Sequence, residues 1–143
     1  MLRILLTFTL GLGGAVAFAA ETANPIMTLP LSDVQWDDTP EGVAFAALEG
    51  DRFTGQYMAL VRLPAGIKSP VHTKTANMFG VMIAGEMKHY PKGMAEPDRK
   101  VVGVGGFYKI PANIAHVSEC VSSEECIAFL YQDGPFDFVP VAD

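Results

Sequence analysis

The stretch GIKSPVHTKTANMFGVMIAG, residues 66–85, decides how the rest of the sequence is interpreted. It starts and ends with glycine, and His72 follows the first glycine after five intervening residues, with Lys74 two positions further on. Residues two apart in a β-strand face the same side, so His72 and Lys74 are expected to point in one direction. The stretch therefore carries a metal site, a site that has lost its metal, or a strand pair with an isolated histidine.

On both sides of this stretch, from Ile26 onward, the chain consists of short β-rich segments separated by glycine and proline. This spacing is typical of a β-sandwich or barrel. The expected strands cover residues 43–50, 55–63, 77–84, 86–90, 106–110 and 125–133. In the second of these, alternation puts Tyr57, Ala59, Val61 and Leu63 on one face. No convincing helical periodicity is found, so we expect an all-β fold.

Residues 1–20 have the features of a signal peptide. Arg3 supplies the positive charge, an apolar run follows over residues 4–18, and small residues end the segment. The apolar run is shorter than the ~20 residues that a membrane span needs, which disfavours a retained anchor. We expect cleavage after Ala19 or Ala20 and export to the periplasm or to the outside of the cell.

The remaining residues, 21–143, have the length of one domain. Without Arg3 they hold nine basic and sixteen acidic residues, a net charge of −7. The basic residues form no cluster, and this balance argues against nucleic acid and against an anionic membrane surface as partners. We therefore expect a protein that leaves the membrane once its signal peptide is removed.

The two cysteines, Cys120 and Cys126, are separated by VSSEE. An exported protein meets an oxidising environment, so a disulfide between them is expected. If they flank a hairpin loop as a non-hydrogen-bonded pair, a Cα separation of ~4.5 Å suits the bond. A structural bond is a better interpretation than a redox or copper site.

The stretch quoted above matches, in outline, a motif of a known family. That motif runs Gly, five residues, His-any-His, three or four residues, Glu, six residues, Gly. The corresponding positions here are Gly66, His72, Lys74, Met78 and Gly85. Both glycines and the first histidine are retained, whereas the second histidine and the glutamate are replaced.

The family's second motif runs Gly, five residues, Pro-any-Gly, two residues, His, three residues, Asn. Here its positions are Gly105, Pro111, Asn113, His116 and Cys120. The two motifs in this order resemble those of the cupins, and the wider chain is similar to an uncharacterised cupin subfamily carried by many bacteria. The resemblance implies a cupin double-stranded β-helix, also called an RmlC-like jelly-roll barrel, over residues 21–143.

The resemblance also implies a site inside the barrel. The cupin motifs hold a divalent metal through imidazole and carboxylate groups, a set that suits Fe(II), Mn(II), Zn(II) or Ni(II). Only His72 and His116 survive at those positions. Protonated Lys74 has no lone pair and repels a dication, and the thioether of Met78 is a poor partner for a hard one. A metal is therefore expected to be absent or weakly held.

The third histidine, His89, follows Gly85 on the next expected strand. If it faces inward, His72, His89 and His116 form an alternative three-histidine set. Its face is open at this point, because a bulge at the preceding turn would reverse it. Each histidine also has a plain interpretation, in which it hydrogen-bonds within the barrel or caps a strand end.

Lys74, Met78 and Met82 are the candidates for lining a ligand pocket. An amine inside an apolar barrel would have a lowered pKa and could act as a base, form a Schiff base or anchor a carboxylate. The favoured expectation for Lys74 is instead a solvated charge at the barrel mouth. Met78 and Met82 would share a face, where we expect them to fill the core with soft, adaptable surface.

Taken together, the sequence predicts small-molecule binding inside the barrel of an exported cupin with a depleted metal site. One alternative is a metal-dependent enzyme of the dioxygenase or isomerase type, which uses His72 and His116, with His89 added if it faces inward, so whether the chain is an enzyme stays open. A second alternative is a non-catalytic interaction or scaffold protein, which the tendency of cupins to form homodimers supports. The identity of the ligand cannot be read from the fold, because this fold serves many functions.

Overall fold

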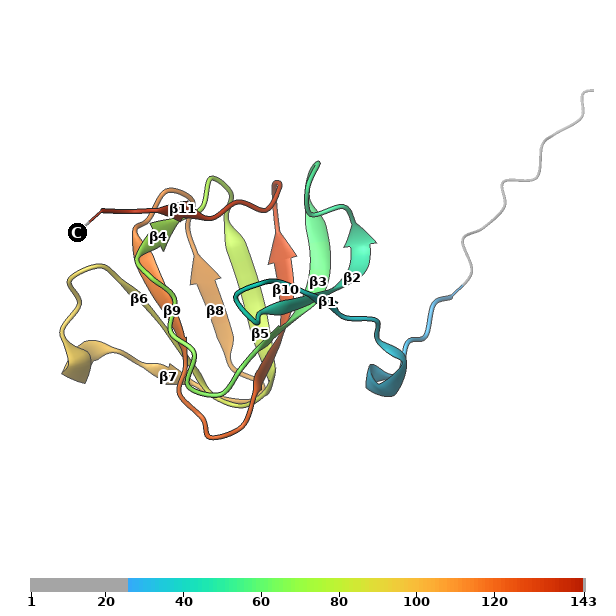
Figure 1. Cartoon of the computed structure of the whole chain (residues 1–143), viewed down its shortest axis with the longest axis horizontal. Coiled ribbons are helices and arrows are strands. Elements are labelled where there is room, and N and C mark those ends of the chain that lie inside the picture. Colours follow the sequence, from blue (N-terminus) through green and yellow to red (C-terminus); the bar gives the residue numbers. More distant parts are fainter. Residues whose placement is uncertain (1–25, 143) are drawn as a thin grey trace, which may run out of the picture.

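The computed structural model of the chain describes residues 26–142, which form an all-β structure of two sheets (Figure 1). The expected signal peptide, residues 1–20, lies outside the described residues. Apart from strands, the chain forms the short 3-10 helices η1 (Leu31–Asp33) and η2 (Glu96–Asp98). Among the residues described, no helix is long and apolar enough to cross a membrane.

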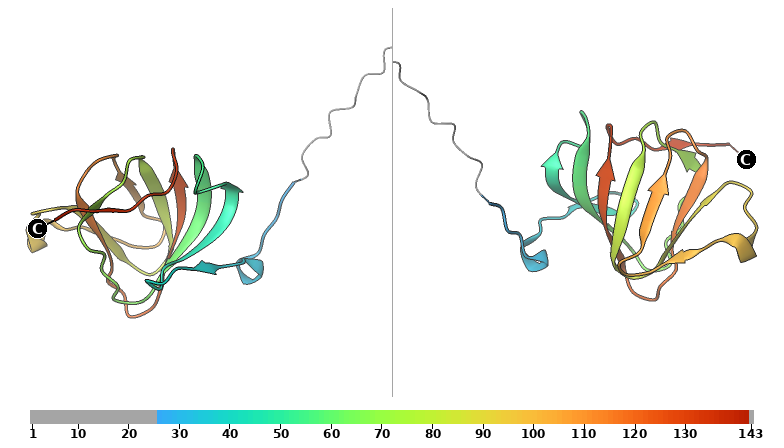
Figure 2. Two further views of the ribbon diagram at one scale, coloured as in Figure 1. Left: turned by 45° about the horizontal axis from the view of Figure 1, so that its top comes forward. Right: turned by 180° about the vertical axis from the view of Figure 1, so that it is seen from behind.

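The larger sheet has the strand order β1-β2-β3-β10-β5-β8. Its strands are β1 (Asp37–Asp38), β2 (Ala44–Gly50), β3 (Tyr57–Leu63), β10 (Cys126–Gln132), β5 (Met78–Ala84) and β8 (Phe107–Ile110). The smaller sheet has the order β11-β4-β9-β6-β7. Its strands are β11 (Val139–Pro140), β4 (His72–Thr73), β9 (His116–Cys120), β6 (Met87–Pro91) and β7 (Val101–Val102). The paired strands run antiparallel, and the two sheets curve around a common interior (Figure 2).

The six strands expected from the sequence are confirmed to within about two residues at each end, the usual uncertainty of strand boundaries. Strand β9 was not predicted. Its inward-facing positions hold His116, Ser118 and Cys120 rather than large apolar residues, so it lacks the alternation that marks a half-buried strand. The strand that sequence analysis missed is thus one that brings polar groups into the interior.

The inner face of the larger sheet forms the main core. Tyr57, Ala59 and Val61 of β3 are buried on this face, as the alternation in the sequence predicted. Met78 and Met82 of β5 are buried in the same cluster, in agreement with the expected core-filling role. Small residues at several inner positions leave room in the middle of the barrel.

The outer face of the larger sheet is also apolar. Part of it is covered by the chain before β1, where Val34 and Trp36 pack against Leu60. The rest carries exposed apolar side chains from β3, β5 and β8, namely Met58, Val81, Ile83 and Phe107. Antiparallel sheets with one solvated face normally carry mostly polar side chains on that face, so this sheet is unusual in carrying several apolar side chains on both faces.

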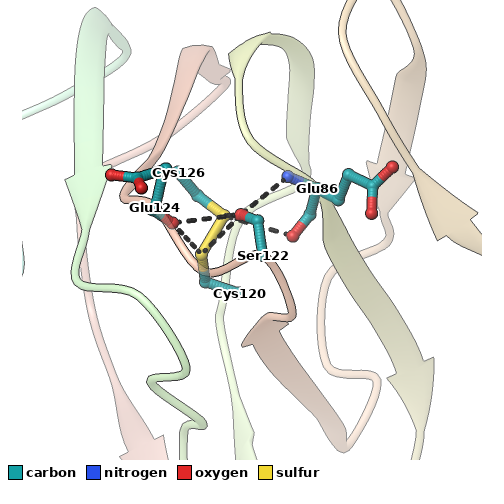
Figure 3. The surroundings of a disulfide bond; sticks show 5 residues. All are labelled: Glu86, Cys120, Ser122, Glu124 and Cys126. Carbon is teal, nitrogen blue, oxygen red and sulfur yellow. Dashed lines mark hydrogen bonds between the residues drawn. A yellow bond between two sulfur atoms is a disulfide. The ribbon is translucent and has the colours of Figure 1, made fainter.

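The Cys120–Cys126 disulfide joins the two sheets (Figure 3). Cys120 ends β9 in the smaller sheet and Cys126 begins β10 in the larger one, with their Cα atoms 5.9 Å apart. The disulfide is the one the sequence suggested, but the hairpin was wrong, because β9 and β10 pair with other strands. The bond thus connects the two walls of the barrel rather than two neighbouring strands.

Gly85, at the turn between β5 and β6, lies against this disulfide. Its φ is +72°, and a Cβ added there would come 2.9 Å from Cys126 Sγ and 2.8 Å from Ser122 Oγ. The Ser122 hydroxyl accepts a hydrogen bond from the Glu86 amide and donates one to the carbonyl of Glu124 (Figure 3). The second glycine of the first motif is therefore required both by its backbone conformation and by close packing.

Candidate functional site

The two sheets enclose a cavity of about 400 Å³. Most of its wall is apolar and includes Phe45, Val61, Met87, Leu130 and Phe136. A smaller polar part of the wall includes His72, Lys74, His89 and Ser118. Of the sequence candidates, Met78 lines the cavity as well, whereas Met82 lies behind the wall in the core.

His72 and His116 lie directly opposite each other on β4 and β9. Their ring centroids are 4.2 Å apart, and the two side chains are 3% and 2% exposed. Phe138 stacks on the other side of His72 at a centroid distance of 4.0 Å. The structure thus brings the surviving histidines of the two motifs together.

The hydrogen bonds of both rings determine which nitrogen carries the proton. His72 Nδ1 lies 3.0 Å from the carbonyl of Pro70, and His116 Nδ1 lies 2.8 Å from the carbonyl of Ile114. Because a carbonyl oxygen only accepts, each Nδ1 is the donor and each neutral ring keeps a lone pair on Nε2. His116 Nε2 is buried and has no partner within residues 26–142.

His89 also faces the interior, which answers the question that the sequence left open. It pairs in register with Ser118 of β9, and its Nδ1 lies 2.9 Å from the Ser118 hydroxyl oxygen. Its ring packs against Tyr108 at a centroid distance of 4.1 Å. Like His116, it has a buried Nε2 for which the described part of the chain provides no hydrogen-bond partner.

Lys74 is buried in the cavity wall, so the expectation of a solvated lysine at the barrel mouth was wrong. Its side chain is 6% exposed. The Nζ donates a hydrogen bond of 3.0 Å to the carbonyl of Asp137 and lies 4.2 Å from the centroid of the Phe136 ring. The segment after β10 therefore covers this lysine and keeps it from solvent.

Burial lowers the pKa of all four of these side chains. Desolvation, the largest cause in each case, lowers the pKa of His72 to about 4 and that of His89 to about 3. It also lowers the pKa of His116, and it lowers the pKa of Lys74 to about 8. At neutral pH the three imidazoles are therefore uncharged, and Lys74 is mainly protonated.

The residues at the cupin metal positions do not fit a divalent metal. Two imidazoles with free Nε2 lone pairs are suitable donors, but Lys74 and Met78 occupy the other two positions. Across residues 26–142, no three His, Cys, Asp or Glu side chains are grouped so that they could hold a metal ion. We therefore derive the chemistry of this site from its own side chains.

Several residues of the site were missed by the sequence analysis. Ser118 could have been found, since it follows His116 by two residues on an extended segment and so shares its face. Phe136, Asp137 and Phe138 could not, because their contacts with the cavity depend on where the chain returns after β10.

The fold and the position of this site define a class of protein: the chain has the cupin, or RmlC-like, fold. Within that class it belongs to the family described as "Domain of unknown function (DUF4437)", which matches residues 19–139. Both results confirm the resemblance seen in the two sequence motifs. No curated protein matches the chain in sequence.

Several solved structures are similar in fold. The Schizosaccharomyces pombe Cnp3 cupin domain matches with a TM-score of 0.62 and 15% identity, over 77% of this chain and 75% of that one. An RmlC-like cupin protein from Ralstonia eutropha matches with a TM-score of 0.60 and 20% identity, over 77% and 69%. The polyketide cyclase RemF from Streptomyces resistomycificus matches with a TM-score of 0.62 and 15% identity, over 83% and 87%. At these identities the likeness shows the fold alone.

Proposed function

We propose that the chain is an exported cupin that binds a small, largely apolar molecule inside its barrel, without a tightly held metal. The observation that carries this proposal is the cavity of about 400 Å³, whose wall includes His72 and His89, the latter with an Nε2 that has no partner among the described residues. Since a water molecule takes up ~30 Å³ in the liquid, the cavity has the volume of about a dozen waters. Ligand pockets in proteins start at about this size.

The apolar wall and the imidazoles would contribute in different ways. Burial of an apolar ligand against Phe45, Leu130 and Phe136 would supply most of the affinity. A buried polar atom without a hydrogen-bond partner costs about 1–3 kcal/mol, so a polar ligand group that reaches His89 Nε2 in the cavity wall would recover that cost. The site therefore favours an apolar ligand that also forms hydrogen bonds.

The open interior favours binding over the alternative of a scaffold protein. Small barrels that serve only as scaffolds are often filled by their own side chains. Here a cavity of about 400 Å³ remains between the two sheets.

A pair of matched substitutions tests ligand binding. Val61→Phe adds bulk to the cavity wall, whereas Val104→Phe makes the same change at a position that is 70% exposed. A panel of small aryl alcohols and phenols would be screened by thermal unfolding and then by calorimetry. We expect at least one to bind the unchanged protein and Val104→Phe, and to bind Val61→Phe about tenfold more weakly or not at all.

Failure of every compound, or equal binding to both variants, would reject the proposal. Circular dichroism of Val61→Phe shows whether this variant is folded. If that variant fails to fold, nuclear Overhauser contacts between a bound phenol and Leu130 or Met87 in the unchanged protein provide the same test.

Elemental analysis tests the alternative that the protein is a metal-dependent enzyme. The protein, purified without a histidine tag, should contain well under one metal ion per chain. A stoichiometric metal that disappears in His72→Ala would overturn the proposal in favour of the enzyme. The donor arrangement of His72 and His116 makes this measurement necessary, because Nδ1–H bonded to a carbonyl is also how metal-binding histidines are held.

Export is part of the proposal. The features of residues 1–20 support it, and so does the Cys120–Cys126 disulfide, since such bonds persist in oxidising compartments. Expression of the full chain with a C-terminal tag, followed by cell fractionation and N-terminal sequencing, tests it. We expect a periplasmic or secreted product that starts at Ala20 or Glu21. An uncleaved product in the cytoplasm would overturn it.

A further inference from the structure

Among residues 26–142, Lys74 is the one cationic side chain in the cavity wall. Its ammonium group has three N–H donors, and one of them is used by the carbonyl of Asp137 at 3.0 Å. The ring of Phe136, 4.2 Å away, covers another side of the group. Since Lys74 lines the cavity, the remaining donors are available to whatever occupies it.

This buried ammonium group has no carboxylate partner. Among the ion pairs within 4.0 Å that the described residues form, none includes Lys74. Asp137 is the acid next to it, but its two carboxylate oxygens accept hydrogen bonds from the Thr75 amide at 3.0 and 3.1 Å. The charge of Asp137 raises the pKa of Lys74 and so offsets part of its burial, but the two groups form no ion pair, and a bound anion would stabilise the ammonium group further.

The other titratable groups around the cavity do not provide that anion. His72, His89 and His116 are neutral, and Tyr57 and Tyr108 are uncharged phenols whose pKa is raised by burial. Glu41 also lines the cavity, but it is exposed and forms no ion pair with Lys74 in the part of the chain that is described.

We propose that the ligand is a small apolar carboxylic acid, with its carboxylate paired to Lys74 and a hydroxyl group donating to the imidazole of His72. This inference rests on the proposed function and specifies its ligand class. The carboxylate matches the remaining N–H donors of Lys74, and the hydroxyl matches the Nε2 lone pair of His72, which lines the cavity and whose Nδ1 donates to the carbonyl of Pro70. The hydrocarbon part of the acid would contact Phe45 and Phe136.

The two parts of this recognition are chemically distinct. A carboxylate placed beside an imidazole lone pair would be repelled, because both groups only accept hydrogen bonds. The anion therefore belongs at Lys74 and the donor at His72. Lys74 lies two residues after His72, so both groups are reached from one side of the cavity.

Matched probes test the proposal. 6-Hydroxy-2-naphthoic acid and 6-hydroxy-2-naphthamide have the same ring system and hydroxyl group, and they differ in the anionic group. We expect the acid to bind the unchanged protein at least about tenfold more tightly than the amide at neutral pH. In Lys74→Met this preference should disappear while the amide still binds. Lys109→Met, at an exposed lysine on the outer face of the larger sheet, should keep the preference.

Octanoate and octanol form a second pair of acid and neutral analogue, with an aliphatic chain in place of the aryl ring. Comparison of the two pairs shows whether the site prefers aliphatic or aryl acids. The preference for the acid should appear in at least one pair and should depend on Lys74 there. Equal affinity for acid and neutral analogue in both pairs would overturn the carboxylate inference and leave the proposed function standing. Absence of binding by all four probes would overturn both.

Discussion

His72 and His116 are held in the same way: each lies opposite the other on antiparallel strands, and each directs Nδ1 to the carbonyl two residues before it. Their ring centroids are 4.2 Å apart. These two histidines are the residues retained from the cupin metal-ligand set. Each keeps an Nε2 lone pair that could bind a metal ion, but residues 26–142 place no third metal ligand beside them. The metal site has thus lost some of its ligand residues, whereas the pairing of β4 with β9 that would position them is present.

Restoring one ligand should therefore restore metal affinity. Lys74→His removes a positive charge and adds an imidazole on the face that His72 occupies. We expect the affinity for Zn(II) or Ni(II), measured by competition with a coloured chelator, to rise at least about tenfold over the unchanged protein. Lys74→Met is the control for loss of charge alone and should give a smaller gain. Equal affinities in the two variants would mean that residue 74 does not reach the histidine pair.

The buried histidines should make the protein sensitive to acid. Desolvation lowers the pKa of His89 from its ordinary value of 6.5 to about 3, so between these values the unfolded state binds a proton that the folded state does not. Stability is therefore lost as the pH falls through 6.5 and further toward 3. From about pH 7.5 to about pH 5, this one group accounts for about 2 kcal/mol.

Urea unfolding at these two pH values checks the effect of His89. In His89→Gln, the loss of unfolding free energy between them should be about 2 kcal/mol smaller than in the unchanged protein. The comparison is between pH values for each protein, so any constant cost of the substitution cancels. An identical pH dependence in both proteins would contradict the buried, neutral state of His89.

Lys74 should destabilise the ligand-free protein. Desolvation lowers its pKa from 10.5 to about 8, so its cost to folding is complete below about pH 8 and is gone above 10.5. We expect Lys74→Met to raise the free energy of unfolding at pH 7 by up to about 3 kcal/mol, and we expect this gain to shrink as the pH approaches 10. Denaturant titrations across this range would show it, and a gain that does not depend on pH would contradict it.

Two motif glycines should respond differently to alanine. Gly66 and Gly85 have φ values of +71° and +72°, so either substitution strains the backbone by about 1–2 kcal/mol. Around Gly66 there is nothing within 4 Å of an added Cβ, whereas at Gly85 the Cβ would meet Cys126 Sγ at 2.9 Å. Gly85→Ala should therefore cost about 2 kcal/mol more than Gly66→Ala in chemical unfolding. Equal costs would mean that the disulfide does not pack on Gly85.

The framework of the fold was readable from the sequence because it depends on local chemistry. Asn113 shows this even where the sequence departs from the cupin pattern. It replaces the glycine of the second motif and adopts a φ of +64°. Asparagine is among the few residues other than glycine that tolerate this conformation. A departure in residue type has thus left the turn unchanged.

The chemistry of the site was less readable because it depends on distant contacts. The burial of Lys74 follows from a hydrogen bond to Asp137, far along the chain, and no local pattern indicates that contact. The inward direction of His89 depends on its register with Ser118, a residue of the strand that was not predicted. The spacing of the motifs identified the candidate site residues. Their contacts, however, depend on the path of the chain after β10, which the spacing does not predict.

The apolar outer face of the larger sheet has a consequence for how the chain reaches its native state. A slip of one residue in strand pairing exchanges the two faces of a strand. In β5 such an exchange would replace buried Met78 and Met82 by Val81 and Ile83, which is a small change in hydrophobicity. Burial of apolar side chains alone then gives little energetic preference for correctly paired intermediates over misregistered ones. Misregistered intermediates are prone to aggregate. Correct alignment during folding must come from the glycine turns and from oxidation of the cysteines, so recovery of native protein should depend strongly on refolding under oxidising conditions.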